Sequence, residues 1–383
     1  MPIRIPLIVV ALAAAGFVTS TLAAATPIAV QERALVMPKL PAGAEVPMNL
    51  PEDGAVKMPF VTGGPPGVAS RINQVVWHEM LDGADAPTAP GKTFTPRPDK
   101  LPQGTSSLEY KADLQPAANP RLLSLAFSGE GCGAYCEEYT TTRVFDLRDG
   151  RELSLGDLLT VDGFAAVGHR LDAERRRAYQ AQVRELRAAL KSAPKGKKKD
   201  ADDDTSDRLA LNEDCLKQAE SQPTPPHWLL SDAFSLDGRG GLVLTRGRCS
   251  NHANRALDDV DEIKVAVPAA DLKALLTPYG LAVVRQEGDA PPPPPFAGRE
   301  LHGRLAGLAV TMKLEPLRDG ADTRGTYEYD KFHTPIPLTV RKEGSEVRAF
   351  EQAGEFELTP AGGSLVGTWR DKDHRKELAV ILQ

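Results

Sequence analysis

The stretch RLLSLAFSGEGCGAYCEEYTTTRVFDLRDGRELSLGDLL, residues 121–159, decides the fold of this chain. Leu123, Leu125 and Phe127 alternate with smaller or polar residues, which is the period of a half-buried β-strand. A glycine-rich segment with two cysteines follows, and residues 141–147 then predict a second strand. We expect the two strands to pair as neighbours in one antiparallel sheet.

The end of this stretch contains a turn signal and a helix start. Asp149 and Gly150 favour a tight hairpin turn because both residue types tolerate positive φ, and residues 151–155 are predicted to return as a third strand. Ser154 and Asp157 are typical of a helix N-terminus, where a hydroxyl and a carboxylate accept hydrogen bonds from unpaired first-turn amides. The stretch therefore predicts a β-meander that leads into a helix.

Apolar spacing on either side of the meander predicts further helices and strands. Apolar residues recur at helical spacing over residues 68–81 and 164–190, and they alternate with polar residues over 263–267. After residue 298, short alternating runs with turn residues between them predict an all-β part. The expected fold class is α+β: a β-meander with packed helices, followed by a small all-β barrel or sandwich.

Proline and charge clusters indicate where the chain divides. Five consecutive prolines at residues 291–295 predict extended polyproline II, so we assign residues 286–297 to a Pro-rich linker. The linker follows an α+β envelope domain over residues 26–285 and precedes an all-β domain over residues 298–383. Within the first domain, KGKKKDADDDTSD at residues 195–207 joins a basic block to an acidic one and predicts a disordered charged insert.

The N-terminal segment, residues 1–25, predicts a secretory signal peptide. Arg4 precedes an apolar run over residues 5–18, and the small residues Ala23–Ala25 fit a cleavage site. The alternative is an uncleaved membrane anchor, for which the apolar run is short. We therefore expect an exported bacterial protein, periplasmic or secreted, with no transmembrane segment after the signal is removed.

The four cysteines are an even number in a protein that we expect to be exported. In an oxidising compartment the simplest interpretation is two disulfides, for which three pairings are possible. We favour Cys132–Cys136, which closes the glycine-rich loop, and Cys215–Cys249. The alternative is a metal site that includes His252, but the spacings are looser than those of structural zinc sites. We expect no metal and no cofactor.

Composition and motifs argue against two broad classes of function. The net charge of −6 at pH 7 does not predict the basic face that nucleic acid binding calls for. The sequence contains no G-x-S-x-G nucleophile motif, and His78-Glu79 is followed by Asp82 where a zinc protease helix has its second histidine. We therefore expect no nucleic acid partner, and we assign no catalytic residues.

Two runs of residues resemble a known family. They are GEGCGAY at Gly129–Tyr135 and VFDLRDGRELSLGDL at Val144–Leu158. Roughly residues 30–285 resemble the extracellular domain of lysozyme-sensing anti-sigma factors, which also occurs attached to some peptidoglycan deacetylases. The resemblance implies an α+β fold and a cell-envelope setting. It implies lysozyme binding for one branch only, and we do not expect that branch's transmembrane anchor and cytoplasmic domain in this protein.

The C-terminal part is similar to small periplasmic β-domains. The similarity rests on a Gly-x-Tyr-x-Tyr strand at Gly325, Tyr327 and Tyr329, and on a closing Gly-x-Trp at Gly367 and Trp369. Residues of this kind belong to strands and turns, so the similarity implies a fold and not an activity.

Acidic and aromatic residues around the cysteine loop form the candidate binding surface. They are Glu130, Tyr135, Glu137, Glu138 and Tyr139. Such a surface suits a basic protein, for which the resemblance implies a lysozyme-like protein, and peptidoglycan is the other partner considered. The opposing interpretation is that Tyr135 packs on its own disulfide while the glutamates are merely solvated. The leading hypothesis is an exported, non-catalytic bacterial envelope protein that binds a lysozyme-like protein or a cell-wall component.

Two other functions remain open. The first is a peptidoglycan-directed enzyme or its accessory domain, for which the groups to test are Asp146, Asp157, His227 and His252. Carboxylates that converge in a cleft would favour this enzyme hypothesis. The second is a structural envelope protein whose C-terminal β-domain makes the contact.

Overall fold

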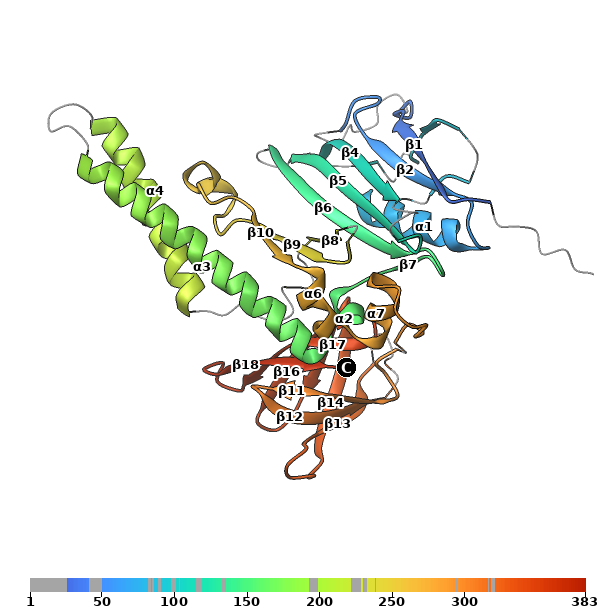
Figure 1. Cartoon of the computed structure of the whole chain (residues 1–383), viewed down its shortest axis with the longest axis vertical. Helices are drawn as coiled ribbons and strands as arrows, with labels where there is room; N and C mark the ends of the chain where they lie inside the picture. Colours follow the sequence, from blue (N-terminus) through green and yellow to red (C-terminus); the bar gives the residue numbers. More distant parts are fainter. Residues whose placement is uncertain are drawn as a thin grey trace, which may run out of the picture.

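The chain folds into three packed parts: an N-terminal sheet region, a central helical region and a C-terminal barrel (Figure 1). The computed structural model describes residues 26–40, 50–81, 84, 86–88, 91–97, 101–102, 104–114, 119–132, 136–192, 199–221, 229, 233–237, 239–293, 295–315, 317 and 321–383. Helices and sheets occur together, which confirms the predicted α+β class. Of the described helices, none combines the length and the apolar content that a membrane crossing needs.

A small sheet and a helix form the outer side of the N-terminal region. The elements are β1 (Ala29–Leu35), β2 (Lys57–Thr62), β3 (Thr93–Phe94) and α1 (Val68–Met80), with strand order β2-β1-β3. The helix is joined to the sheet by a buried amide, because Asn73 Oδ1 accepts from the Val61 N–H at 2.7 Å and Asn73 Nδ2 donates to the Val61 carbonyl at 2.9 Å. The polar group is thereby satisfied inside an apolar core.

The predicted meander forms the main sheet of this region. Its strands are β4 (Thr105–Leu114), β5 (Leu122–Cys132), β6 (Cys136–Asp146) and β7 (Arg151–Glu152), antiparallel and in chain order. Leu123 lies opposite Phe145, as the apolar alternation predicts. The turn into β7 uses Gly150 at φ 73°, where a Cβ would lie 2.8 Å from the Val68 carbonyl oxygen. The third strand is shorter than predicted because a helix cap begins at Ser154.

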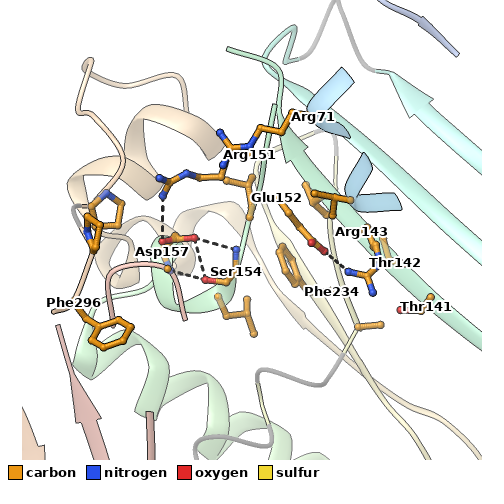
Figure 2. Close-up of a pocket in the computed structure, with 18 residues that line it drawn as sticks. Arg71, Thr141, Thr142, Arg143, Arg151, Glu152, Ser154, Asp157, Phe234 and Phe296 are labelled. Carbon is orange, nitrogen blue, oxygen red and sulfur yellow. Dashed lines mark hydrogen bonds and ion pairs between the residues drawn. The ribbon is translucent and has the colours of Figure 1, made fainter. Parts of the chain in front are cut away.

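The predicted helix start is confirmed as a capping box at α2 (Leu155–Leu158) (Figure 2). The Asp157 N–H donates to Ser154 Oγ at 3.2 Å, and the Ser154 N–H donates to Asp157 Oδ2 at 3.3 Å. Two orphan amides of the first turn are thus satisfied by each other's side chains.

The meander is buried on one face and partly covered on the other. Leu123, Leu125 and Phe127 point into one core together with Trp77 of α1. Residues between them point the other way, and Val144 on β6 belongs to the core of the central region. The meander therefore lies between the N-terminal helix and the central region, and it links their two cores.

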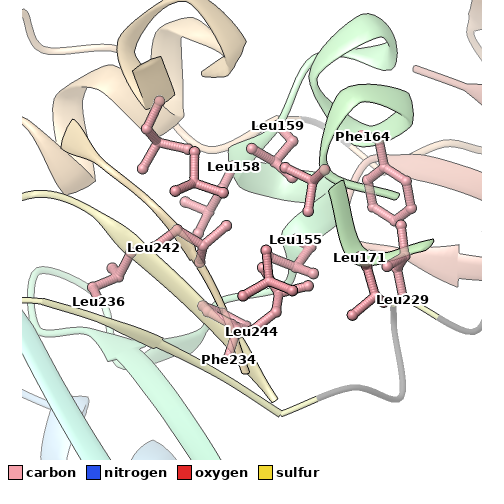
Figure 3. Close-up of a cluster of buried hydrophobic side chains, with 14 of the residues drawn as sticks. Leu155, Leu158, Leu159, Phe164, Leu171, Leu229, Phe234, Leu236, Leu242 and Leu244 are labelled. Carbon is pink, nitrogen blue, oxygen red and sulfur yellow. The ribbon is translucent and has the colours of Figure 1, made fainter. Parts of the chain in front are cut away.

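The central region consists of a helical pair, a small sheet and short helices. The elements are α3 (Val161–Ser192), α4 (Lys199–Ser221), β8 (Ala233–Leu236), β9 (Leu242–Arg246), η1 (His252–Leu257), β10 (Ile263–Val267), α6 (Ala269–Leu272), η2 (Lys273–Leu275) and α7 (Pro278–Val284). Strands pair antiparallel in the order β10-β9-β8. Leu155, Phe164, Leu171, Phe234 and Leu244 meet in one buried cluster (Figure 3).

Part of the predicted disordered insert is helical. Residues 195–198 lie outside the described residues, but residues 199–207 form the first turns of α4. An ion pair at i,i+4 between Asp204 and Arg208 (3.1 Å) supports these turns, and α4 packs alongside α3. Charge alone predicts disorder, whereas the structure places residues 199–207 in a helix that packs against α3, and the predicted disorder stays a prediction.

The C-terminal region is a closed antiparallel barrel. Its strands are β11 (Glu300–Leu305), β12 (Leu308–Leu314), β13 (Thr323–Tyr329), β14 (Ile336–Glu343), β15 (Glu346–Phe350), β16 (Gly354–Ala361), β17 (Ser364–Asp371) and β18 (Glu377–Leu382). The Tyr327 hydroxyl and Trp369 Nε1 both donate to Glu351 Oε1, at 2.9 and 2.8 Å. The tyrosine and tryptophan singled out in the sequence are therefore structural residues of the barrel.

The barrel packs directly on α2. Ser364 Oγ donates to the Gly156 carbonyl at 3.1 Å, and the Gln383 amide donates to the Leu159 carbonyl. A Cβ on Gly156 would lie 2.6 Å from the Ala361 Cβ, so the backbone approach requires glycine. The predicted domain boundaries stay a prediction, but the two sides of the predicted linker share one apolar core.

Candidate functional site

The β5–β6 hairpin holds the residues of the predicted binding surface. Cys132 lies opposite Cys136 at the end of the hairpin, and a disulfide joins them in the pairing that the sequence favours. Tyr135 lies outside the described residues, so its predicted role stays a prediction. The positions of the other four residues follow from the strand register.

These four residues do not share one face of the hairpin. Glu130 lies opposite Glu138, and Gly129 lies opposite Tyr139. Cross-strand partners share a face and successive residues alternate, so Glu130 and Glu138 lie on one face while Glu137 and Tyr139 lie on the other. The predicted single patch is thus divided between two faces, although the period of two was readable in the sequence.

The side chains of Glu130 and Tyr139 make contacts within the sheet. Ser106 Oγ on β4 donates to Glu130 Oε2 at 2.7 Å. The ring of Tyr139 lies over Gly129, and burial raises the pKa of its hydroxyl. Both side chains therefore act first as packing and hydrogen-bonding groups of the meander.

Glu137 and Glu138 line a groove of about 560 Å³ between the hairpin and the end of the β8–β10 sheet. The lining of this hairpin groove consists of residues 137–141, Ala233, Thr245, Gly247, Arg248, Ser250, Arg255, Asp261 and Glu262. Its two walls are connected where Thr140 Oγ1 donates to Glu262 Oε1 at 2.9 Å. The groove therefore combines segments that are more than a hundred residues apart in the chain.

The hairpin groove has more acidic than basic side chains. Four carboxylates line it, Glu137, Glu138, Asp261 and Glu262, against two arginines, Arg248 and Arg255. Arg248 forms an ion pair with Glu137 and is only 16% exposed, whereas Asp261 at the rim is 74% exposed. Glu138 is exposed as well. The accessible charge of the groove is consequently negative.

Both disulfides of the protein adjoin this groove. Cys136 immediately precedes Glu137 on one wall, and Cys249 lies between the lining residues Arg248 and Ser250 on the other. Cys249 is joined to Cys215 on α4, again the pairing that the sequence favours. Each wall is thus covalently fixed next to the side chains that it presents.

A buried tyrosine positions the second wall. The Cys249 N–H donates to the Tyr179 hydroxyl at 3.0 Å, and this hydroxyl donates to Asp258 Oδ2 at 3.3 Å. Asp258 Oδ2 also accepts from the Ser250 N–H at 3.0 Å. Burial raises the pKa of Tyr179, which keeps the phenol protonated and able to donate.

One cluster of metal-type side chains lies at the hairpin end. Glu130, Cys132 and Cys136 place their ligand atoms within 4.8 Å of one another. Both sulfurs are bonded to each other, and a disulfide offers no thiolate to a metal. Glu130 is therefore the remaining ligand of the group, which does not make a metal site.

Asp146, a residue of the enzyme hypothesis, is held in an internal network. Its buried carboxylate accepts from Arg121 Nη2 at 2.7 Å, from the Tyr279 hydroxyl at 2.9 Å and from the Arg148 N–H at 3.0 Å. Burial alone would raise the pKa of Asp146, but these donors lower it below its ordinary value. The network connects the meander to α7 and uses the carboxylate for structure.

The other residues of the enzyme hypothesis do not form a constellation with Asp146 in the part of the chain that the structure describes. Asp157 caps α2, and burial raises its pKa. His227 lies outside the described residues, and His252 begins η1 without a described side chain. The enzyme hypothesis therefore stays untested by the geometry.

The second wall of the groove was missed in the sequence. Arg248, Arg255, Asp261 and Glu262 surround Cys249 in a polar segment between two strands. The assignment of Cys249 to a disulfide would have allowed the charged residues beside it to be predicted as part of a rigid surface. Nothing local in the sequence indicates that this segment faces the β5–β6 hairpin.

Comparisons with known proteins include a match to a solved structure. The chain matches no protein-family model and no curated protein. A solved DUF3298 family protein from Pseudomonas aeruginosa is 16% identical with a TM-score of 0.33, over 66% of this chain and 96% of that one. A likeness at this level carries no argument about function. The resemblance to lysozyme-sensing anti-sigma factors therefore stays a prediction.

Proposed function

We propose that this chain is an exported protein of the bacterial cell envelope that binds a basic segment of a partner protein in the hairpin groove. The observation that carries the proposal is the position of the two disulfides, one beside each wall of a single acidic groove. Disulfides of this kind persist outside the reducing cytosol, which agrees with the predicted signal peptide.

Fixed walls favour binding because they reduce the conformational entropy that is lost on association. A loop that is already ordered loses little conformational freedom when a partner docks, so more of the contact energy appears as affinity. The network of Tyr179, Asp258 and Cys249 orders the second wall in the same way. The groove is therefore built as a preorganised surface and not as a flexible loop.

The charge of the groove indicates the partner's chemistry. Glu138 and Asp261 are exposed, and among the described residues the cation contact of Asp261 is a loose one, 4.0 Å from Arg248, so both carboxylates are available to lysines and arginines of a partner. Single exposed ion pairs contribute about 0.2–1 kcal/mol each, so affinity requires several together and falls with salt. A lysozyme-like protein has this chemistry, and a cell-wall component is the alternative.

The test is binding of lysozyme to the oxidised protein without residues 1–25, with immobilised oligolysine and purified peptidoglycan as parallel probes. We expect saturable lysozyme binding that weakens on raising salt and weakens about tenfold or more in Glu138→Lys/Asp261→Lys. The matched control is Glu346→Lys/Asp373→Lys, an equal charge change at exposed barrel positions that do not line the groove, which should bind like the unmodified protein.

Three outcomes would contradict the proposal. They are no binding to lysozyme or oligolysine, equal weakening by the control pair, and retention on peptidoglycan alone. Binding to oligolysine with the same charge dependence but not to lysozyme would keep the acidic groove and reject lysozyme as the partner.

A further inference from the structure

A second cavity lies where the three parts of the molecule meet. This junction pocket has a volume of about 610 Å³, within the range of roughly 300–1,000 Å³ typical of small-molecule sites. Its lining comes from α1, β6, β7, α2 and β8, and from the segment before β11 (Figure 2). Thr141 and Ala233 line both this pocket and the hairpin groove, so the two cavities adjoin along β6.

Three arginines line the junction pocket: Arg71, Arg143 and Arg151. Arg143 is engaged, since its Nη1 lies 2.7 Å from Glu152 Oε1. Arg71 is exposed at the mouth, and its hydrogen bond to the Asp149 carbonyl is long at 3.4 Å. Figure 2 shows Arg71 and Arg151 close together on one side of the pocket.

Arg151 is weakly engaged as well. Its nearest carboxylate contacts are 3.8 Å to Asp157 Oδ1 and 3.9 Å to Asp149 Oδ2, which are longer than hydrogen bonds. A guanidinium has five N–H donors, so Arg71 and Arg151 keep donors for an additional acceptor. Planar forks of this kind match a carboxylate, a sulfonate or a phosphate.

The pocket's own carboxylates do not cancel this charge. Glu152 is paired with Arg143, and Asp157 is turned into the capping box of α2. Two acids against three arginines leave a positive balance.

The remaining lining is apolar and aromatic. Phe234 on β8 and Phe296 before the barrel line the pocket together with Pro293 and Pro295. In Figure 2 the Phe296 ring and the Phe234 ring lie away from the Arg71–Arg151 side. Rings and prolines present flat apolar surface to a ligand body, while the arginines take its charged end.

We propose that the junction pocket is a binding site for an amphipathic organic anion, with the anionic group on Arg71 and Arg151 and the apolar or ring-shaped body against Phe234 and Phe296. This site is independent of the partner proposed for the hairpin groove. A ligand here contacts the meander, the central sheet and the segment before the barrel at once.

The test is a titration with 8-anilinonaphthalene-1-sulfonate, an anionic aromatic probe whose fluorescence rises when bound. We expect saturable binding near one probe per chain, weakened about tenfold in Arg71→Glu. Arg71 is exposed, so this change leaves the core intact. The matched control Arg375→Glu, at an 82% exposed arginine on a barrel turn, should bind the probe like the unmodified protein.

A second variant and two competitors make the assignment specific. Phe296→Ala should also weaken probe binding, and decanoate should displace the probe at concentrations where inorganic phosphate does not. Unsaturable probe binding, unchanged binding in Arg71→Glu, or displacement by phosphate but not by decanoate would overturn the proposal. A thermal melt of each variant separates loss of the site from loss of the fold.

Discussion

Each wall of the hairpin groove is held by its own disulfide, whereas the barrel is held on α2 by close packing and by hydrogen bonds to backbone carbonyls. Cys132–Cys136 and Cys215–Cys249 adjoin the groove. At the barrel junction, Gly156 approaches Ala361 and its carbonyl accepts from Ser364. In both regions segments that are distant in sequence meet, but only the groove has a disulfide beside each of its walls.

The difference follows from what each region can bury. The groove walls are glycine-rich or charged, so little apolar surface is available to hold them. At the barrel junction, Ala361, Val366 and Ile381 enter the same core as Leu155 and Leu158. Where apolar burial is scarce, crosslinks substitute for it, as in small exported domains.

The largest effect is expected from removing the longer crosslink. The sequence separation between Cys215 and Cys249 is 34 residues, so Cys215→Ala/Cys249→Ala should lower the free energy of unfolding by about 3–4 kcal/mol. The separation in Cys132–Cys136 is only 4 residues, so its alanine pair should cost about half as much. Urea denaturation of the two variants measures both values, and equal losses would contradict the loop-closure explanation.

A methyl group at the barrel junction should have the next largest effect. In Gly156→Ala the new Cβ would lie 2.6 Å from the Ala361 Cβ and 2.8 Å from its carbonyl oxygen, so we expect a loss of about 2 kcal/mol. The matched control is Gly247→Ala, where nothing lies within 4 Å of the new Cβ and the change should stay within about 0.5 kcal/mol. Thermal or urea unfolding compares them, and equal stabilities would show that the barrel is not closely packed on α2.

The buried Asp146 network should respond more mildly to loss of a single donor. Tyr279→Phe removes a 2.9 Å hydrogen bond to Asp146 and should lower the free energy of unfolding by about 1 kcal/mol. Tyr110→Phe is the control, because no hydrogen bond of its hydroxyl is among the contacts of the described residues. If the two variants lose the same stability, the hydroxyl of Tyr279 contributes only its ring packing.

The smallest effects concern pH, and their signs are opposite at two aspartates. The folded pKa of Asp146 is below its ordinary 3.8, so its stabilising contribution is present at neutral pH and is lost as pH falls through that folded pKa. The folded pKa of Asp157 is above its ordinary 3.8. Its ionisation therefore makes the protein less stable as pH rises from the unfolded pKa to the folded pKa.

Two asparagine variants test these signs by urea unfolding at several pH values. Relative to the unmodified protein, Asp146→Asn should lose more stability at about pH 7 than at about pH 3. Relative to the unmodified protein, Asp157→Asn should gain stability as pH rises from about 4 to about 7. Parallel pH curves for the two variants would contradict the opposite directions.

Local signals predicted the elements well because their causes are local. The alternation of Leu123, Leu125 and Phe127 sets a strand face, and the Asp149–Gly150 pair sets a turn. The hydroxyl and carboxylate of the Ser154 cap lie within one helical turn of each other. Such contacts form between residues that are close in the sequence, so they can be predicted from a short segment alone.

The candidate binding surface stays a prediction, and its contacts with the rest of the fold could not be predicted because they are not local. Glu137 and Glu138 were assigned to a surface from their place beside a disulfide, and they line the groove. Tyr139 lines the groove as well and also packs over Gly129, whereas Glu130 accepts a hydrogen bond from Ser106 on β4. The strand β4 that engages Glu130 is more than twenty residues away in the chain, beyond the reach of a local pattern.

By itself, the sequence determined the α+β class, the meander with its capped helix, the favoured disulfide pairing and the strands of the C-terminal part. Each of these depends on periodicity, turn chemistry or oxidising context. Only the tertiary structure decided that those strands close into a barrel, that the charged turns of α4 form against α3, and that Thr140 meets Glu262 across the groove. These outcomes depend on burial between residues far apart in the chain, where the free energy belongs to the assembled core and not to any one segment.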